Sequence, residues 1–116
     1  MKGYKNSEYF ISFLNRIYVC KVPFDLLVID KRPKTRAGVY IPNKRRIRIY
    51  SRWEDRIPLE EIAIHEYAHH IHFTEQEKGD ERPHGPQFWE IFGALMCVAE
   101  QKGLYKRERV SDIARG

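Results

Sequence analysis

A chain of 116 residues with a formal net charge of +5 and 42% hydrophobic residues is long enough to build one modest hydrophobic core. Its 32% charged and 13% aromatic residues exclude an intrinsically disordered chain, and no apolar run approaches the roughly 20 residues of a membrane span, so we expect no membrane partner. We expect a single domain over residues 1–116, and the lack of a secretory signal pattern at the N-terminus favours a cytoplasmic location.

The first predicted elements are a helix and a strand. Apolar residues recur at helical spacing over residues 7–18, and Ser7 is a plausible N-cap of this helix. The segment of residues 24–29 is short and rich in residues that favour β-strands, which is typical of a buried strand.

A β-hairpin is expected next. Residues 38–41 and 46–50 have the pattern of two strands, and residues 42–45 would form the turn between them. Ile47 and Ile49 alternate with arginines, so the two isoleucines should share one face of the second strand.

Two further helices complete the predicted domain. One begins near Pro58 and runs to about His72, and the other begins near Pro86 and ends at Gly103. A polar loop over residues 75–83 separates them, and residues 104–116 form a charged tail. The order of elements predicts an α+β fold, with a small three-stranded sheet packed against an N-terminal, a central and a C-terminal helix.

The positive charge is concentrated in one segment. Residues 31–52 contain nine basic side chains and no acid, whereas the rest of the chain has 12 basic and 16 acidic residues. Such a segment can bind an anionic partner, here a nucleic acid, or it can be an ordinary solvated face.

The residues from His65 to His69 form an HExxH motif. On a helix, His65 and His69 lie one turn apart on the same face, where two imidazoles can bind one zinc ion. Glu66 lies about 100° further round the helix. It can therefore take a proton from a zinc-activated water without binding the metal itself, as a peptidase requires.

A catalytic zinc site needs a third protein ligand and one open position. We favour His84, which stands in a rigid turn at the start of the last helix. His72 is a second candidate, but it lies about 10.5 Å along the helix axis from His65, too far for both to bind one ion. A glutamate of the last helix, Glu90 or Glu100, is the third candidate.

The sequence also suggests an environment or a role for several further side chains. His70 points away from His65 and is expected to be solvated, while Cys20 and Cys97 have apolar neighbours and are expected to be core thiols. The spacing does not choose the group that stabilises an oxyanion, for which the candidates are an arginine and three tyrosines (Tyr40, Tyr50 and Tyr105).

The stretch HEYAHH, followed by HGPQFWEIFGAL from His84 onward, resembles the SprT-like (Spartan-type) metallopeptidases of the zincin clan. The resemblance implies a minimal zincin-like domain that hydrolyses protein or peptide substrates. It also implies that His65, His69 and His84 bind zinc and that Glu66 is the catalytic acid/base. Some members are DNA-dependent proteases that act on proteins crosslinked to DNA.

Two competing interpretations stay open. The chain is also similar in size to the minigluzincins, in which a glutamate is the third zinc ligand. The first interpretation is therefore a minigluzincin-like peptidase. The second interpretation is a nucleic-acid-associated module with a structural zinc and no peptidase activity. If the chain is a zincin-type protease, the resemblance implies that substrate lies along the edge of the hairpin over residues 38–50. The basic side chains there would then favour anionic proteins or proteins held on nucleic acid.

Overall fold

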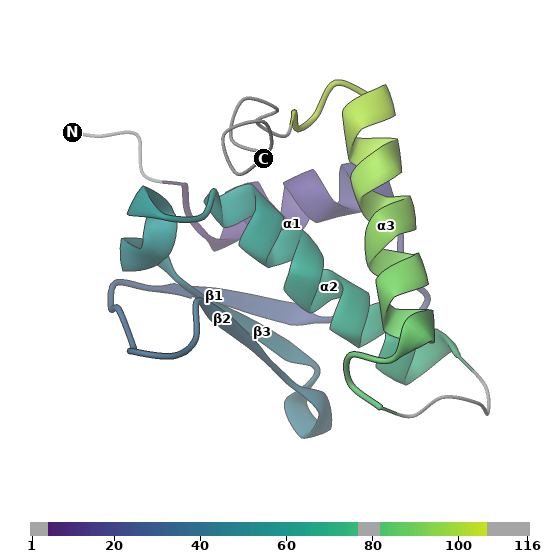
Figure 1. The fold of residues 1–116 in the computed structure, drawn as a ribbon, viewed down its shortest axis with the longest axis horizontal. Helices are drawn as coiled ribbons and strands as arrows, with labels where there is room; N and C mark the ends of the chain where they lie inside the picture. The colour runs from purple at the N-terminus through teal and green to yellow at the C-terminus, as the bar shows by residue number, and fades with distance from the viewer. Residues whose placement is uncertain (1–4, 77–81, 107–116) are drawn as a thin grey trace, which may run out of the picture.

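The computed structural model of the chain describes residues 5–76 and 82–106. The helices lie on one side of a three-stranded sheet, as Figure 1 shows, which confirms the predicted α+β fold. In chain order the elements are α1 (Ser7–Ile17), β1 (Asp25–Ile29), β2 (Gly38–Ile41), the 3₁₀ helix η1 (Pro42–Lys44), β3 (Arg46–Tyr50), the 3₁₀ helix η2 (Ser51–Asp55), α2 (Leu59–Glu75) and α3 (Pro86–Gln101).

The sheet is mixed, with strand order β1–β3–β2. β1 runs parallel to the central strand β3, and β2 pairs with β3 in antiparallel fashion, so β2 is an edge strand. The predicted hairpin is confirmed with the same strand bounds. Its turn contains η1 and ends at Arg45, which has a positive φ of 47°. Ile47 and Ile49 are both fully buried, as their alternation with arginine indicated.

α2 lies at the centre of the hydrophobic core, in contact with α1, α3, β2 and β3. It begins at Leu59, after Pro58 as N-cap, and continues about one turn beyond the predicted end at His72. Because neighbours cover α2 on several sides, nine of its 17 residues are buried. This central position lets α2 hold side chains between the sheet and α3.

Some local expectations were wrong. The N-cap of α1 is Asn6, not Ser7, because the Asn6 side chain accepts a hydrogen bond from the Tyr9 backbone N–H at 3.0 Å. β1 is not a fully buried strand: Leu26 faces the helices and is buried, whereas Leu27 is 40% exposed. The reason is that helices cover only one face of the sheet, so alternate residues of β1 face outward.

One of the two cysteines differs from expectation, whereas Cys20 packs against the hydrophobic core as predicted. Cys97 is exposed on the outer side of α3, so it is not a core thiol, and Cys20 is half-buried with its Sγ 3.1 Å from the carbonyl oxygen of Val22. The predicted loop over residues 75–83 and the tail over residues 104–116 lie partly outside the described residues. Among the helices of the described part of the chain, none is both long and apolar enough to cross a membrane.

Candidate metal centre

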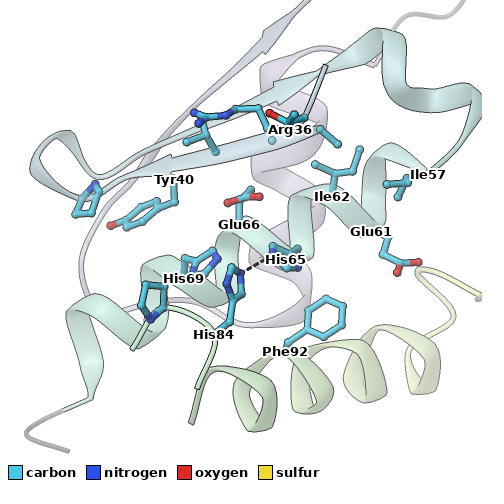
Figure 2. A pocket seen from close by; sticks show the side chains of 16 residues that line it. Arg36, Tyr40, Ile57, Glu61, Ile62, His65, Glu66, His69, His84 and Phe92 are labelled. Carbon is cyan, nitrogen blue, oxygen red and sulfur yellow. Dashed lines mark hydrogen bonds between the residues drawn. The ribbon is translucent and has the colours of Figure 1, made fainter. Parts of the chain in front are cut away.

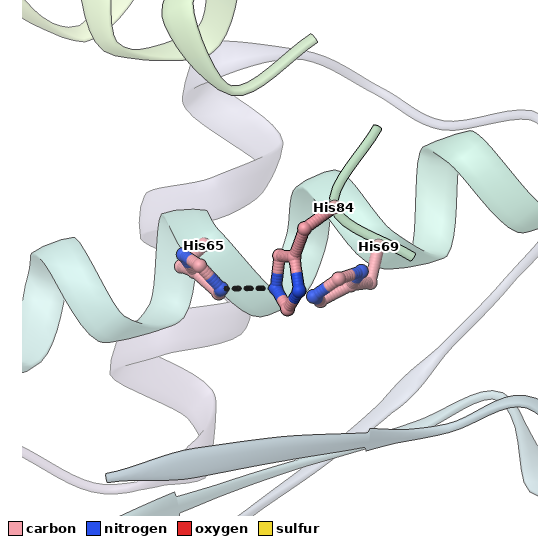
Figure 3. A group of neighbouring side chains, drawn as sticks. All are labelled: His65, His69 and His84. Carbon is pink, nitrogen blue, oxygen red and sulfur yellow. Dashed lines mark hydrogen bonds between the residues drawn. The ribbon is translucent and has the colours of Figure 1, made fainter. Parts of the chain in front are cut away.

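Two segments bring three histidines together. His65 and His69 project from consecutive turns of α2, and His84 approaches them from the turn that precedes α3 (Figure 3). That turn is fixed by local contacts: the Trp89 Nε1–H donates to the His84 carbonyl oxygen at 3.0 Å, and the buried Gly85 caps α3. The three side chains predicted as zinc ligands are therefore neighbours in space.

The spacing of these side chains fits a zinc ion. The Nε2 atoms of His65 and His84 are 3.4 Å apart, and one ligand atom from each of the three histidines lies within 4.8 Å of the others. Ligands about 2.0–2.1 Å from a tetrahedral zinc are separated by about 3.3 Å. In the described part of the chain, the rival candidates His72, Glu90 and Glu100 do not join this group.

The protonation of the cluster suits a metal. Burial lowers the pKa of His69 to about 3, and the neighbouring histidines His65 and His84 lower it further in the same direction. Burial, followed by the charge of His84, also lowers the pKa of His65. The two helix imidazoles are therefore neutral at physiological pH, which is the form that binds a metal.

Glu66 lies beside the histidines at the wall of a pocket of about 570 Å³ (Figure 2). The pocket is open between β2, α2 and the start of α3. Glu66 is only 7% exposed, and burial raises the pKa of its carboxyl to about 8, while the positive charge of Arg36 acts in the opposite direction. A buried carboxyl of raised pKa next to the neutral imidazoles of His65 and His69 is the arrangement expected of a group that exchanges protons beside a metal.

Comparison with known proteins agrees with this geometry. The model of the family described as SprT-like matches residues 7–107. The chain belongs to the SprT-like family. The match runs from the first residue of α1 past the end of α3, so it includes every element that builds the histidine cluster. No curated protein matches the chain significantly, and no solved structure does.

Membership in the SprT-like family means that the chain carries a zincin-type, metalloprotease-like domain of a generally zinc-associated kind. The roles of His65, His69, His84 and Glu66 stay predictions. The structure does bring all four together at one pocket, as their spacing in the sequence and the resemblance indicated.

Among the tyrosines considered for oxyanion stabilisation, Tyr40 is the one that lines this pocket of the SprT-like domain. The Tyr105 hydroxyl instead donates to Glu61 Oε1 at 3.0 Å. Arg36 also lines the pocket, in the loop before β2, and it had no distinguishing signal in the sequence beyond its charge.

His70 was expected to be solvated, and that expectation was wrong. Its side chain is fully buried, with Nδ1 2.7 Å from the Tyr40 hydroxyl and Nε2 2.7 Å from the Val22 carbonyl oxygen. The expectation assumed that α2 has a solvent side opposite the zinc ligands. Because the sheet and the segment before β1 cover that side, His70 is a core residue.

Proposed function

We propose that this chain is a zinc-dependent metallopeptidase in which His65, His69 and His84 hold the metal and Glu66 is the general base. One observation carries the proposal: three imidazole nitrogens within 4.8 Å of one another share a pocket with a buried carboxyl group. The family assignment supports the same reaction class.

The residues of the pocket divide the chemistry between them. When bound, zinc lowers the pKa of a water molecule and polarises a carbonyl group. Glu66 accepts a proton from the attacking water, and the same carboxyl then delivers a proton to the leaving amine. Because Glu66 is buried, its carboxylate is poorly solvated and is a stronger base than an exposed glutamate.

The edge strand β2 supports a peptide as substrate. In the described part of the chain, one edge of β2 pairs with β3 and no strand pairs with the other edge, while residues of β2 line the pocket. An extended peptide could add to this edge by main-chain hydrogen bonds. Its scissile bond would then pass between β2 and the histidines of α2.

A structural zinc module is less well supported. Structural zinc sites are normally closed by four protein ligands. The histidine cluster has three members within the described residues, and one of them, His84, is exposed. An open fourth position favours an enzyme over a structural role.

Replacement of Glu66 by glutamine tests the proposal. We expect Glu66→Gln to keep zinc and fold but to lose at least about 100-fold in the rate of cleavage of an unfolded protein, because the amide cannot accept the proton. Zinc content would be measured by elemental analysis and the fold by circular dichroism. Glu90→Gln, on the exposed side of α3, is the matched control and should cleave at the wild-type rate.

Two results would contradict the proposal. Cleavage by Glu66→Gln at the wild-type rate would exclude Glu66 as the base. A zinc-loaded wild type that cleaves no unfolded protein or peptide would leave the metal site without the peptidase function.

A further inference from the structure

A chain of hydrogen bonds runs from the Tyr40 hydroxyl through the buried His70 to the backbone of Val22. Both links are 2.7 Å long. Tyr40 comes from the edge strand β2, His70 from α2, and Val22 from the segment before β1. The aromatic rings of Phe24 and Tyr67 pack beside His70, with ring centroids 5.5 and 6.3 Å away.

The chemistry of these two hydrogen bonds fixes which group donates and which accepts in each. The Val22 carbonyl can only accept, so His70 Nε2 must carry the proton. His70 Nδ1 is then the acceptor of a neutral imidazole, and the Tyr40 hydroxyl donates to it. His70 is fully buried, and burial raises the pKa of the Tyr40 hydroxyl to about 12, so the hydroxyl keeps its proton.

Tyr40 also belongs to the pocket that holds the histidine cluster. Its ring lines this pocket on the β2 side, and Glu66 and His69 line it on the α2 side (Figure 2). Tyr40 is half-buried at the edge of the sheet, with its ring centroid 5.5 Å from that of His70. His70 follows His69 directly, so the helix that presents the predicted ligands also presents the partner of the tyrosine.

We propose that Tyr40 is a catalytic hydrogen-bond donor to the carbonyl oxygen of the scissile peptide and that His70 is its positioning residue. The inference rests on the proposed peptidase function. When the water oxygen attacks the carbonyl carbon, the C=O π electrons move to the oxygen, which becomes negatively charged. The Tyr40 hydroxyl exchanges its neutral acceptor, His70 Nδ1, for this oxyanion and returns to His70 when the C–N bond breaks.

The exchange favours the transition state over the ground state. A hydrogen bond to an ionised acceptor is roughly twice as strong as one between neutral groups. Tyr40 therefore gains little from a neutral carbonyl but gains from the charged oxygen, which is the difference that accelerates a reaction. The two remaining tyrosine candidates are placed less well: Tyr105 donates to Glu61, and Tyr50 is outside the lining of the pocket.

Tyr40→Phe removes the hydroxyl and keeps the ring, so it tests the donor directly. We expect kcat to fall by about 100-fold, with KM and zinc content unchanged, because an oxyanion donor acts only in the transition state. The affinity for a phosphinic peptide, a tetrahedral analogue, should fall by the same factor. The affinity for the uncleaved peptide, measured in the Glu66→Gln background, should not change. Tyr50→Phe, in the same hairpin, is the control and should leave all five quantities at wild-type values.

His70→Gln tests the positioning role. Its amide can donate to Val22 and accept from Tyr40, so a folded variant is expected to retain part of the activity. Its effect on kcat should be present with Tyr40 and absent in the Tyr40→Phe background, because His70 acts through the hydroxyl. Nitrogen NMR of the wild type should find the His70 proton on Nε2, and the Nδ1 signal should shift in Tyr40→Phe.

The outcomes separate this inference from the proposed function. If Glu66→Gln abolishes cleavage while Tyr40→Phe matches the wild type in kcat, the peptidase function stands and the Tyr40 role is wrong. A raised KM at constant kcat, or a loss of zinc in Tyr40→Phe, would also overturn it. If the wild type cleaves nothing, the peptidase function fails; equal phosphinic-peptide affinities of wild type and Tyr40→Phe would then overturn the donor role as well.

Discussion

His84 is held by a turn, whereas the two remaining histidines of the cluster are held by a helix. The turn is fixed at both sides, since the Gly85 N–H donates to the Arg82 carbonyl oxygen at 3.2 Å and the Trp89 indole donates to the His84 carbonyl oxygen. The Trp89 ring also stacks on His84, with centroids 5.9 Å apart. The position of His84 is therefore set before any metal binds.

The contribution of His84 to metal binding can be measured against that of His72. His84→Ala should weaken zinc binding by more than about 100-fold, because two imidazoles remain for an ion that takes three protein ligands and water. His72→Ala should keep the wild-type affinity, since His72 is not part of the cluster. Zinc titration against a competing chelator measures both. Equal losses in the two variants would return His72 or a glutamate to consideration as the third ligand.

At the scale of elements, β2 and α2 approach each other closely at Gly38. A Cβ atom on Gly38 would lie 2.7 Å from Ile62 Cγ2 and 3.1 Å from both Glu66 Cγ and the Arg48 carbonyl oxygen. The 2.7 Å approach is too short for any real side-chain carbon. The absence of a side chain at this one position allows the edge strand to lie against the helix that carries Glu66.

Gly38→Ala should therefore cost about 1–3 kcal/mol of unfolding free energy, the usual cost of overpacking, and should also lower activity because Glu66 is displaced. Gly93→Ala in α3 is the control. It has no atom within 4 Å of the added carbon, and replacing a helical glycine by alanine stabilises by about 0.5–1 kcal/mol. Urea unfolding compares the two. We expect Gly38→Ala to lower the free energy of unfolding and Gly93→Ala to raise it. No change in Gly38→Ala would mean that the strand and the helix can separate freely.

Much of this architecture could be predicted from local patterns. The strand β3 alternates strictly between isoleucine and larger polar side chains, because one of its faces is buried and the opposite face is not, and the bounds of both hairpin strands were correct. The parallel pairing of β1 with β3 could not be predicted, since it depends on contacts far apart in the sequence.

In the candidate site, too, some features could be predicted from the local sequence and others could not. The spacing of His65 and His69 is a property of one helix and could be read directly, whereas the motif around His84 was needed to join it to them. The burial of His70 could not be predicted from the sequence. Periodicity reveals the inner face of a helix only if another face is solvated, and α2 is covered on several sides.

At the scale of the whole molecule, the basic segment of residues 31–52 is partly neutralised. Three of its nine basic side chains form ion pairs with acids outside the segment: Arg32 with Asp55, Arg46 with Asp25 at 3.0 Å, and Arg52 with Asp30 at 2.8 Å. The charge available to a partner is therefore smaller than the sequence indicates.

The remaining six basic side chains form no ion pair within the described residues, and they are distributed along the sheet (Lys31, Lys34, Arg36, Lys44, Arg45 and Arg48). The loop before β2 and the turn at η1 lie at opposite ends of the hairpin, as Figure 1 shows. Arg48 lies between them on the face away from the helices, and its buried Nε has no hydrogen-bond partner in the described part of the chain. We propose that these residues, apart from Arg36, which lines the pocket, form a basic strip that contacts a nucleic acid.

Charge reversal at the two ends of this strip tests the nucleic-acid partner. Lys34→Glu with Lys44→Glu should weaken DNA binding at low salt, because two phosphate contacts and the counterions that they release are lost. The slope of log K against log salt should become shallower by about 1.4–1.8, at roughly 0.7 per contact for single strands and 0.9 for duplex. Zinc content should not change, since neither lysine touches the histidine cluster.

The matched control reverses two exposed basic residues outside the segment, Arg16 and Lys21, so that the net charge changes by the same amount. If binding depends on the strip, this control keeps most of the wild-type affinity, because neither residue belongs to the strip. Equal weakening in both double variants would mean that DNA responds only to net charge. A wild type with no DNA affinity at low salt would mean that the strip is a solvated sheet face, whose lysines keep the edge strand β2 from pairing with further chains.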